Sequence, residues 1–340
     1  MNFKSYSDLS ADIKDNLHII SDKDFDLIVG IPRSGMVPAY MLALYLNIDV
    51  LDLAKFCENA ELTRGNTRNA KHAIRRAWDA RRVLFVDDSI LSGRSFADAV
   101  QKVPADCHCR IETLAIYSSE KFRQDVDYTF SYLPMPRIFE WNVFHHQALS
   151  DACVDIDGVL CVDPTELQND DGECYRQFLL NAQPLFIPTA PISVLVTNRL
   201  EKYRSETEFW LKQHGVEYDK LVMLDLPSKA ERQRLGIHAK NKADYFRSSN
   251  HQLFIESEAK QAQYICKRAS KAVYCVDNGE FYSPSNLMHS VKKPDQALLR
   301  VYHSLPISIK RYARAVFRFM KAQSYSRSNC LAWVTAICCL

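Results

Sequence analysis

The sequence has no hydrophobic run that approaches the ~20 residues a membrane-spanning helix requires. Charge of one sign is also lacking, because 43 basic and 41 acidic residues leave a formal net charge of +2. Such a balance gives no strong overall attraction to nucleic acid, and we expect no nucleic-acid partner. Residues 1–4 lead into a polar segment without an apolar stretch, so we expect no secretory signal.

A disulfide framework is a further feature that the sequence does not indicate. It has eleven cysteines, an odd number, and several lie inside apolar, strand-like runs, as Cys153 and Cys275 do. Such cysteines are typical of reduced, buried thiols in a reducing compartment. We therefore expect a cytoplasmic protein.

Strand-like apolar runs alternate with helix-like segments along most of the 340 residues. This alternation predicts the α/β class, with two doubly wound parallel-sheet domains followed by a helical tail. We place the domains at residues 1–148, 149–290 and 291–340. The strands are expected at residues 26–31, 50–53, 82–88 and 110–117, then at 152–157, 192–198, 221–224, 252–256 and 272–277. Helices are expected at residues 37–46 and 95–103.

The most specific pattern of the first half begins at residue 82. An apolar strand delivers Asp87 and Asp88 to its carboxyl end, and a short, hydroxyl-rich loop leads into a helix. The carboxylates can accept hydrogen bonds from a vicinal diol, while the loop and helix start offer N–H groups to a phosphate. A diol and a phosphate at this separation indicate ribose 5-phosphate. The alternative is an ordinary connection in which the carboxylates cap the helix.

This segment resembles the motif with which type I phosphoribosyltransferases bind 5-phosphoribosyl 1-pyrophosphate (PRPP). Residues 29–36 resemble the pyrophosphate loop of that family, and the basic stretch 55–82 lies where the family carries a catalytic loop. The resemblance implies a cytoplasmic enzyme that uses Mg²⁺ and displaces pyrophosphate from PRPP with inversion at the anomeric carbon. Which basic residue between positions 64 and 76 contacts the pyrophosphate stays open.

The resemblance also assigns roles to individual residues. The ribose hydroxyls fall to Asp87 and Asp88, the 5-phosphate to Ser89, Ser92, Gly93, Arg94 and Ser95, and the pyrophosphate to Arg33, Ser34 and Gly35. Asp87 and Asp88 are also assigned as catalytic, since the oxocarbenium-like centre needs carboxylates beside it. Many family members have glycine or threonine where this chain has Arg94 and Ser95.

A second pattern opens the second half. Asp155 and Asp157 flank Ile156 at the end of an apolar strand, and Gly158 follows. One carboxylate of such a pair can attack phosphorus while the other handles the proton of the leaving group. The alternative is a turn of the Asp-x-Asp type at a strand end.

This pattern resembles the first motif of haloacid dehalogenase (HAD) phosphatases, and residues 195–198, 238–245 and 253–258 resemble the motifs that follow it. The resemblance implies that Asp155 is the nucleophile, Asp157 the acid and base, Thr197, Asn198 and Lys242 the phosphate ligands, and Asp155, Asp157 and Glu256 the Mg²⁺ ligands. Lys242 is preferred over Lys240, and the role of Glu258 stays open. Only about thirty residues separate the first two strands of this half, so we expect an open site without a full cap domain.

The tail has apolar residues at helical spacing between positions 309 and 320, with basic residues on the other face. This predicts a basic amphipathic helix, which either contacts an anionic membrane surface or packs on the body of the protein. A membrane contact would make the protein peripheral on the inner face of the membrane.

Together the two motifs predict a bifunctional enzyme. Transfer of a phosphoribosyl group followed by loss of its phosphate amounts to β-ribofuranosyl transfer, onto a saccharide acceptor such as a lipid-linked bacterial surface polysaccharide. The alternative is a nucleobase phosphoribosyltransferase fused to a nucleotidase, in which the aromatic residues of segment 120–146, Trp141 among them, stack on the base. A third class, a PRPP sensor or RNA-binding regulator, leaves the phosphatase motifs unexplained.

Overall fold

The computed structural model describes residues 1–63, 74–236 and 238–285. The predicted tail and most of the predicted basic loop lie outside these residues. Met1–Pro284 form one compact unit, which contains two large sheets and one two-stranded sheet.

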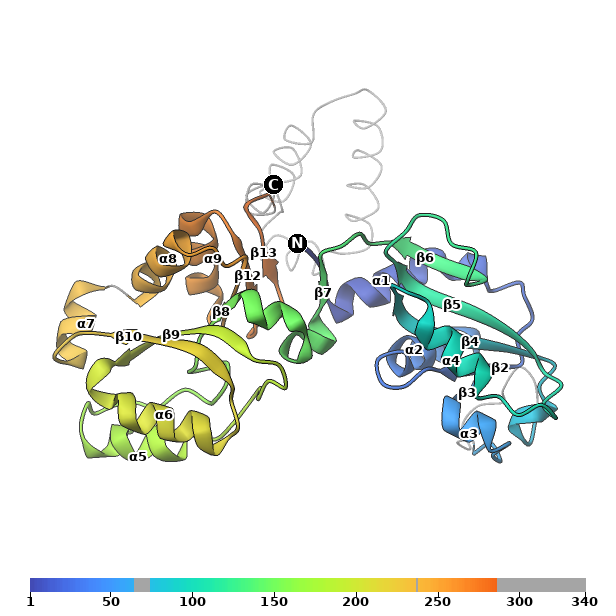
Figure 1. Ribbon diagram of the computed structural model, residues 1–340, viewed down its shortest axis with the longest axis horizontal. Helices are drawn as coiled ribbons and strands as arrows, with labels where there is room; N and C mark the ends of the chain where they lie inside the picture. The colour runs from blue at the N-terminus through green and yellow to red at the C-terminus, as the bar shows by residue number, and fades with distance from the viewer. Residues whose placement is uncertain (64–73, 237, 286–340) are drawn as a thin grey trace, which may run out of the picture. The chain divides into compact units, whose positions relative to one another are not determined.

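The first large sheet has five strands in the order β3-β2-β4-β5-β6, and every neighbouring pair is parallel (Figure 1). The strands are β2 (Leu27–Gly30), β3 (Asp49–Asp52), β4 (Arg82–Ile90), β5 (Arg110–Ser118) and β6 (Tyr128–Tyr132). From β2 the chain goes first to one side, to β3, and then to the other side, to β4. The sheet is therefore doubly wound, and its order reverses between β2 and β4.

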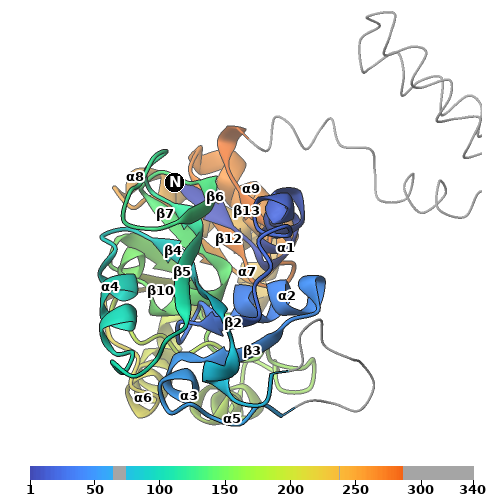
Figure 2. The ribbon, with the colours of Figure 1, turned by 90° about the vertical axis from the view of Figure 1, so that its right-hand side faces the viewer.

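Helices cover both faces of this sheet (Figure 2). On one face lie α1 (Tyr6–Asn16) and α2 (Met36–Leu46), and on the other lie α3 (Leu53–Cys57) and α4 (Arg94–Gln101). Side chains of β4 alternate between the two cores, since Leu84 packs with the first pair of helices and Phe85 with the second. Burial on both faces explains the unbroken apolar run of this strand.

A small sheet of two strands was not predicted. It pairs β1 (Asn2–Lys4) in parallel with β7 (Arg137–Phe139). Strands of three residues are too short to show an alternation of apolar and polar residues, so the sequence carries no signal for them. A short helical segment, Glu140–His145, follows β7, and Val143 and Phe144 of that segment pack in the core of the second large sheet.

The second large sheet has the order β10-β9-β8-β11-β12-β13. Its strands are β8 (Ala152–Val154), β9 (Ile192–Leu200), β10 (Tyr218–Leu224), β11 (Leu253–Glu256), β12 (Ala272–Cys275) and β13 (Phe281–Tyr282). All pairs are parallel except β12 with β13, an antiparallel pair that was not predicted. The order reverses between β8 and β11, so this sheet is doubly wound as well.

Five helices accompany the second large sheet among the described residues. They are α5 (Glu173–Asn181), α6 (Arg204–Gln213), α7 (Lys229–Leu235), α8 (His238–Ser248) and α9 (Ala259–Ala269). In Figure 1, α5 and α6 lie on one face of the strands, and α8 and α9 lie on the other. The predicted α/β class with parallel sheets is thus confirmed.

The core of the second large sheet depends strongly on Trp210 of α6, which is fully buried and donates a hydrogen bond from Nε1 to the carbonyl oxygen of Ala182 over 2.8 Å. We predict that Trp210→Ala lowers the free energy of unfolding by about 3–5 kcal/mol, because it leaves a cavity and an unpaired carbonyl. The neighbouring Phe209 is 56% exposed. Phe209→Ala is the matched control and should cost about 0.5 kcal/mol or less. Equal losses in urea unfolding of the two variants would contradict this packing.

Candidate active sites

The first candidate site lies at the carboxyl ends of β2 and β4, where the strand order reverses. A turn after β2 carries the predicted pyrophosphate residues into α2, and Gly35 lies at its close. A Cβ atom added to Gly35 would lie 2.6 Å from the carbonyl oxygens of both Ile31 and Val86. Only glycine fits there, so Gly35 allows the turn to pack directly against the end of β4.

The structure brings two of the predicted motifs into contact at Asp88. The hydroxyl of Ser34 donates to Asp88 Oδ1 over 3.0 Å, and the backbone N–H of Asp88 donates to Asp87 Oδ1 over 2.9 Å. Both carboxylates are buried, at 7% and 4% exposure. Arg33, by contrast, is exposed.

Trp141 is the third partner of this carboxylate pair. Its indole Nε1 donates to Asp88 Oδ2 over 2.6 Å. The ring stacks on Phe139 with centroids 4.8 Å apart and lies 5.5 Å from the ring of Tyr6. An aromatic cluster from two segments of the chain, Tyr6 in one and Phe139 with Trp141 in the other, therefore lies beside the predicted ribose-binding carboxylates.

The predicted phosphate loop connects β4 to α4. Gly93 stands before the helix with φ of +78°, a left-handed conformation that favours glycine. Two guanidinium groups anchor the loop, since Arg137 donates to the carbonyl oxygen of Ile90 and Arg123 to that of Leu91, each over 2.8 Å. These contacts shape the loop without a ligand, and no sequence motif predicted them.

The remaining residues of the loop are more open. Ser89 is half-buried, whereas Ser92, Arg94 and Ser95 are exposed. Their side chains are accessible to a phosphate at the start of α4. Their assignment to the 5-phosphate stays a prediction.

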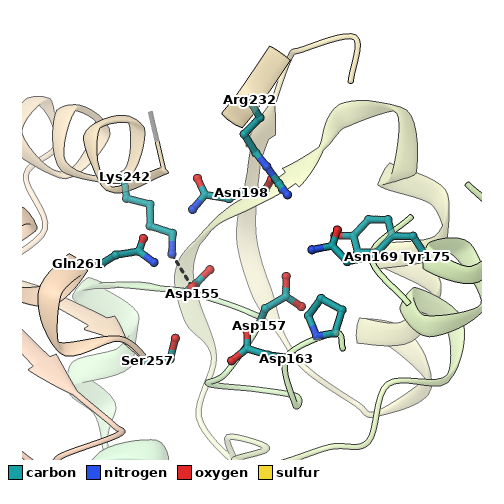
Figure 3. A pocket seen from close by; sticks show the side chains of 11 residues that line it. Asp155, Asp157, Asp163, Asn169, Tyr175, Asn198, Arg232, Lys242, Ser257 and Gln261 are labelled. Carbon is teal, nitrogen blue, oxygen red and sulfur yellow. Dashed lines mark hydrogen bonds and ion pairs between the residues drawn. The ribbon is translucent and has the colours of Figure 1, made fainter. Parts of the chain in front are cut away.

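The second candidate site lies at the carboxyl ends of β8 and β11, again where the strand order reverses. Asp155 follows β8 directly, and Lys242 reaches it from α8. The ammonium Nζ donates to Asp155 Oδ2 over 2.5 Å (Figure 3). It also donates to Glu256 Oε2 over 2.8 Å. All three side chains are buried, and the alternative Lys240 is exposed. The structure thus brings together residues from three of the four predicted phosphatase motifs.

Burial opposes charge on both Asp155 and Lys242. It raises the pKa of Asp155, and the nearby Lys242 ammonium opposes that rise. Burial would lower the pKa of Lys242, but Asp155 and Glu256 hold it above its ordinary value. The carboxylates therefore keep Lys242 charged.

Glu256 has no free oxygen among the described residues. Oε2 faces Lys242, and Oε1 accepts the backbone N–H of Ser257 over 3.1 Å. Glu258, whose role was open, is exposed and accepts a hydrogen bond from Gln261 Nε2 over 2.7 Å.

Asp157 has a partner that was not predicted. Arg199 at the end of β9 is fully buried, and its guanidinium donates to Asp157 Oδ1 over 2.6 Å. Thr197 of the same strand is buried two residues earlier, and its hydroxyl accepts the backbone N–H of Arg199. Because alternate residues of a strand share a face, the spacing of Thr197 and Arg199 was a usable signal.

The second candidate site contains a pocket of about 150 Å³ (Figure 3). Four predicted residues line it, namely Asp155, Asp157, Asn198 and Lys242. The lining also includes residues that were not predicted, among them Asp163, Asn169, Tyr175, Arg232 and Gln261. They come from separate segments, and no local pattern joins them.

The donor set of this pocket suits magnesium. Among the described residues no three acidic, histidine or cysteine side chains form a group that would hold a metal, so the trio of Asp155, Asp157 and Glu256 stays a prediction. Magnesium, however, is commonly held by one or two carboxylates together with water and phosphate oxygens. Asp155, Asp157 and Asp163 each line the pocket, and one or two of these carboxylates would hold the ion.

Comparison with known proteins adds little detail. No family model and no curated protein matches the chain. Among solved structures, a purine phosphoribosyltransferase from Pyrococcus horikoshii Ot3 is 18% identical, covers 41% of this chain and 92% of its own, and has a TM-score of 0.30. A xanthine-guanine-hypoxanthine phosphoribosyltransferase from Helicobacter pylori is 20% identical, covers 42% of this chain and 92% of its own, and has a TM-score of 0.29. An orotate phosphoribosyltransferase from Aeropyrum pernix is 18% identical, covers 37% of this chain and 72% of its own, and has a TM-score of 0.27. TM-scores below 0.5 do not establish a shared fold. The evidence for both sites is therefore their own geometry.

The buried pair Asp87–Asp88 makes stability depend on pH. Burial, and secondly the neighbouring Asp88, raise the pKa of Asp87 to about 8. The folded state therefore binds more protons than the unfolded state between about pH 4 and 8, and stability falls as pH rises through that window. We predict that Asp87→Asn, which removes this charge, becomes progressively stabilising relative to the unmodified chain from pH 5 to pH 9, as thermal unfolding would show.

The exposed Asp106 supplies the control for this experiment. Asp106→Asn should shift the unfolding temperature equally at both pH values. An Asp87→Asn variant that gains no stability relative to the unmodified chain between pH 5 and pH 9 would rule out a protonated Asp87.

Proposed function

We propose that the chain is a bifunctional enzyme that transfers a 5-phosphoribosyl group from PRPP to an acceptor with inversion, releases pyrophosphate, and then removes the 5-phosphate. One observation carries the proposal: two separate doubly wound sheets of one chain each hold buried carboxylates at the point where the strand order reverses. Ligands of open α/β sheets bind at such points.

At the first site, Asp87 and Asp88 would hold the ribose hydroxyls and face the positive charge that develops at the anomeric carbon. The turn that contains Arg33, Ser34 and Gly35 would hold the pyrophosphate, with the exposed guanidinium of Arg33 neutralising part of its charge. The contact between Ser34 and Asp88 supports this arrangement, because it joins the pyrophosphate turn to the ribose carboxylates. Magnesium, when bound, would neutralise the negative charge that builds on the departing pyrophosphate.

At the second site, Asp155 would attack the phosphorus atom of the ribosyl 5-phosphate, and the bond from phosphorus to the ester oxygen would break. Asp157 would donate a proton to that oxygen and then take a proton from the water that hydrolyses the aspartyl phosphate. Lys242 holds Oδ2 of Asp155 and leaves Oδ1 for the attack. Thr197 and Asn198 would bind the remaining phosphoryl oxygens.

The sum of the two steps is β-ribofuranosyl transfer, and we propose a saccharide acceptor on a lipid-linked bacterial surface polysaccharide. The chain between β8 and β9 contains the single nine-residue helix α5, which supports an open site for a bulky product. Among the described residues, no helix has the length and apolarity to span a membrane. Contact of the tail with the inner face of a membrane is part of the proposal.

A second candidate is a nucleobase phosphoribosyltransferase fused to a nucleotidase. The aromatic cluster around Trp141 favours it, because a flat base would stack there beside Asp88. Pyrophosphate release from PRPP, measured with nucleobases and with lipid-linked saccharides as acceptors, separates the two. Release with saccharides supports our proposal, release with nucleobases alone supports the second candidate, and release with neither contradicts both.

The two activities should be separable by mutation, because the two large sheets pack separate cores. We predict that replacing Asp87 and Asp88 together with asparagine abolishes pyrophosphate release and leaves phosphomonoester hydrolysis nearly unchanged. Asp155→Asn should do the reverse and lower hydrolysis roughly a thousandfold or more, because it removes the nucleophile.

Asp106→Asn and Asp151→Asn are the matched controls, since both side chains are exposed and Asp151 lies just before β8. Each control should retain both activities. Hydrolysis that survives in the Asp155→Asn variant would refute the assignment of the second site.

A further inference from the structure

Three residues that line the pocket of the second site each have a buried polar side-chain atom without a hydrogen-bond partner among the described residues. The atoms are Asn198 Oδ1, Arg232 Nε and Gln261 Oε1, and the described residues hold only two other such side-chain atoms. A buried polar atom without a partner costs free energy. The two amide oxygens are acceptors, whereas Arg232 Nε is a donor and can face an anion. Arg232 carries the charge among the three.

Arg232 differs from the other cations of this pocket. Lys242 faces Asp155 and Glu256, and the guanidinium of Arg199 behind the pocket faces Asp157. Arg232, only 9% exposed, has no carboxylate partner among the described residues. Among the described residues, its side chain makes one hydrogen bond, from Nη1 to the carbonyl oxygen of Asn198 over 2.7 Å.

The place of Arg232 suits an anion. It belongs to α7, and Figure 3 shows its guanidinium extending into the pocket beside Asn198, opposite Asp157 and Asp163. The bond to Asn198 ties it to the strand end that carries Thr197 and Asn198. A guanidinium presents several donors in a fixed plane, which matches the oxygens of a phosphate group.

We infer that Arg232 binds the phosphoryl group of the substrate and is the cation that selects a phosphomonoester dianion. Lys242 and Arg199 are already neutralised by carboxylates. Arg232 is therefore the side-chain cation of the described pocket that is available to the two negative charges of the monoester. This inference rests on the proposed phosphatase function and adds a residue that the sequence motifs did not contain.

The test uses the full chain and inorganic phosphate. Calorimetry in the presence of Mg²⁺ measures the binding of phosphate without any turnover. Arg232→Gln should weaken phosphate binding about tenfold to a hundredfold, since charge-assisted hydrogen bonds are lost. It should raise the KM for a phosphomonoester by a similar factor. Arg232→Lys keeps the charge and should recover part of the affinity.

Arg234 provides a matched control on the same helix, because it is exposed and paired with Glu231. Arg234→Gln should leave phosphate affinity and KM unchanged. Phosphate affinity that is unaltered in a folded Arg232→Gln variant, or lost equally in Arg234→Gln, overturns the inference. A loss of phosphate affinity in Arg232→Gln alone supports the inference even where the unmodified chain proves inactive as a phosphatase. Turnover together with unaltered phosphate affinity in Arg232→Gln overturns the role of Arg232 but leaves the proposed phosphatase function in place.

Discussion

In a parallel sheet, neighbouring strands whose connections leave in opposite directions form a crevice at their carboxyl ends. Both large sheets of this chain contain one such reversal, between β2 and β4 and between β8 and β11. The ends of these four strands, or the short segments directly after them, carry Gly35, the Asp87–Asp88 pair, Asp155 and Glu256. Strand order therefore decides which residues meet, although they are as much as a hundred positions apart in the sequence.

Both crevices contain buried carboxylates, and burying a carboxylate is energetically unfavourable. Asp87 lies against Asp88 and forms no ion pair among the described residues, and hydroxyl, indole and backbone donors to the two carboxylates compensate in part. Asp155 and Glu256 instead share the Lys242 ammonium. Buried ionisable groups of this kind are poor sources of stability. Their presence at the two crevices is what we expect where function, and not packing, selects the side chain.

The sequence motifs anticipated the strands that carry the sites, because apolar runs bounded by polar residues are a local signal. The resemblance to known motifs singled out Asp87, Asp88, Asp155 and Glu256 near strand ends and preferred Lys242 over Lys240, and their roles stay predictions. Trp141 reaches Asp88, and Arg232 reaches Asn198, from segments with no pattern of their own. Such partners are fixed by tertiary packing, so a single sequence cannot reveal them. The three-residue strands β1 and β7 were missed for the related reason that their pairing partner, not their pattern, makes them strands.

The central claim is that the two sites act in sequence on one ribosyl group, and the mass of the product of the Asp155→Asn chain tests it most directly. With PRPP and an accepted saccharide, this variant should accumulate a product ~80 Da heavier than that of the unmodified chain, the mass of the phosphoryl group that the phosphatase step removes. An unphosphorylated ribosyl product from the variant would contradict the coupled mechanism.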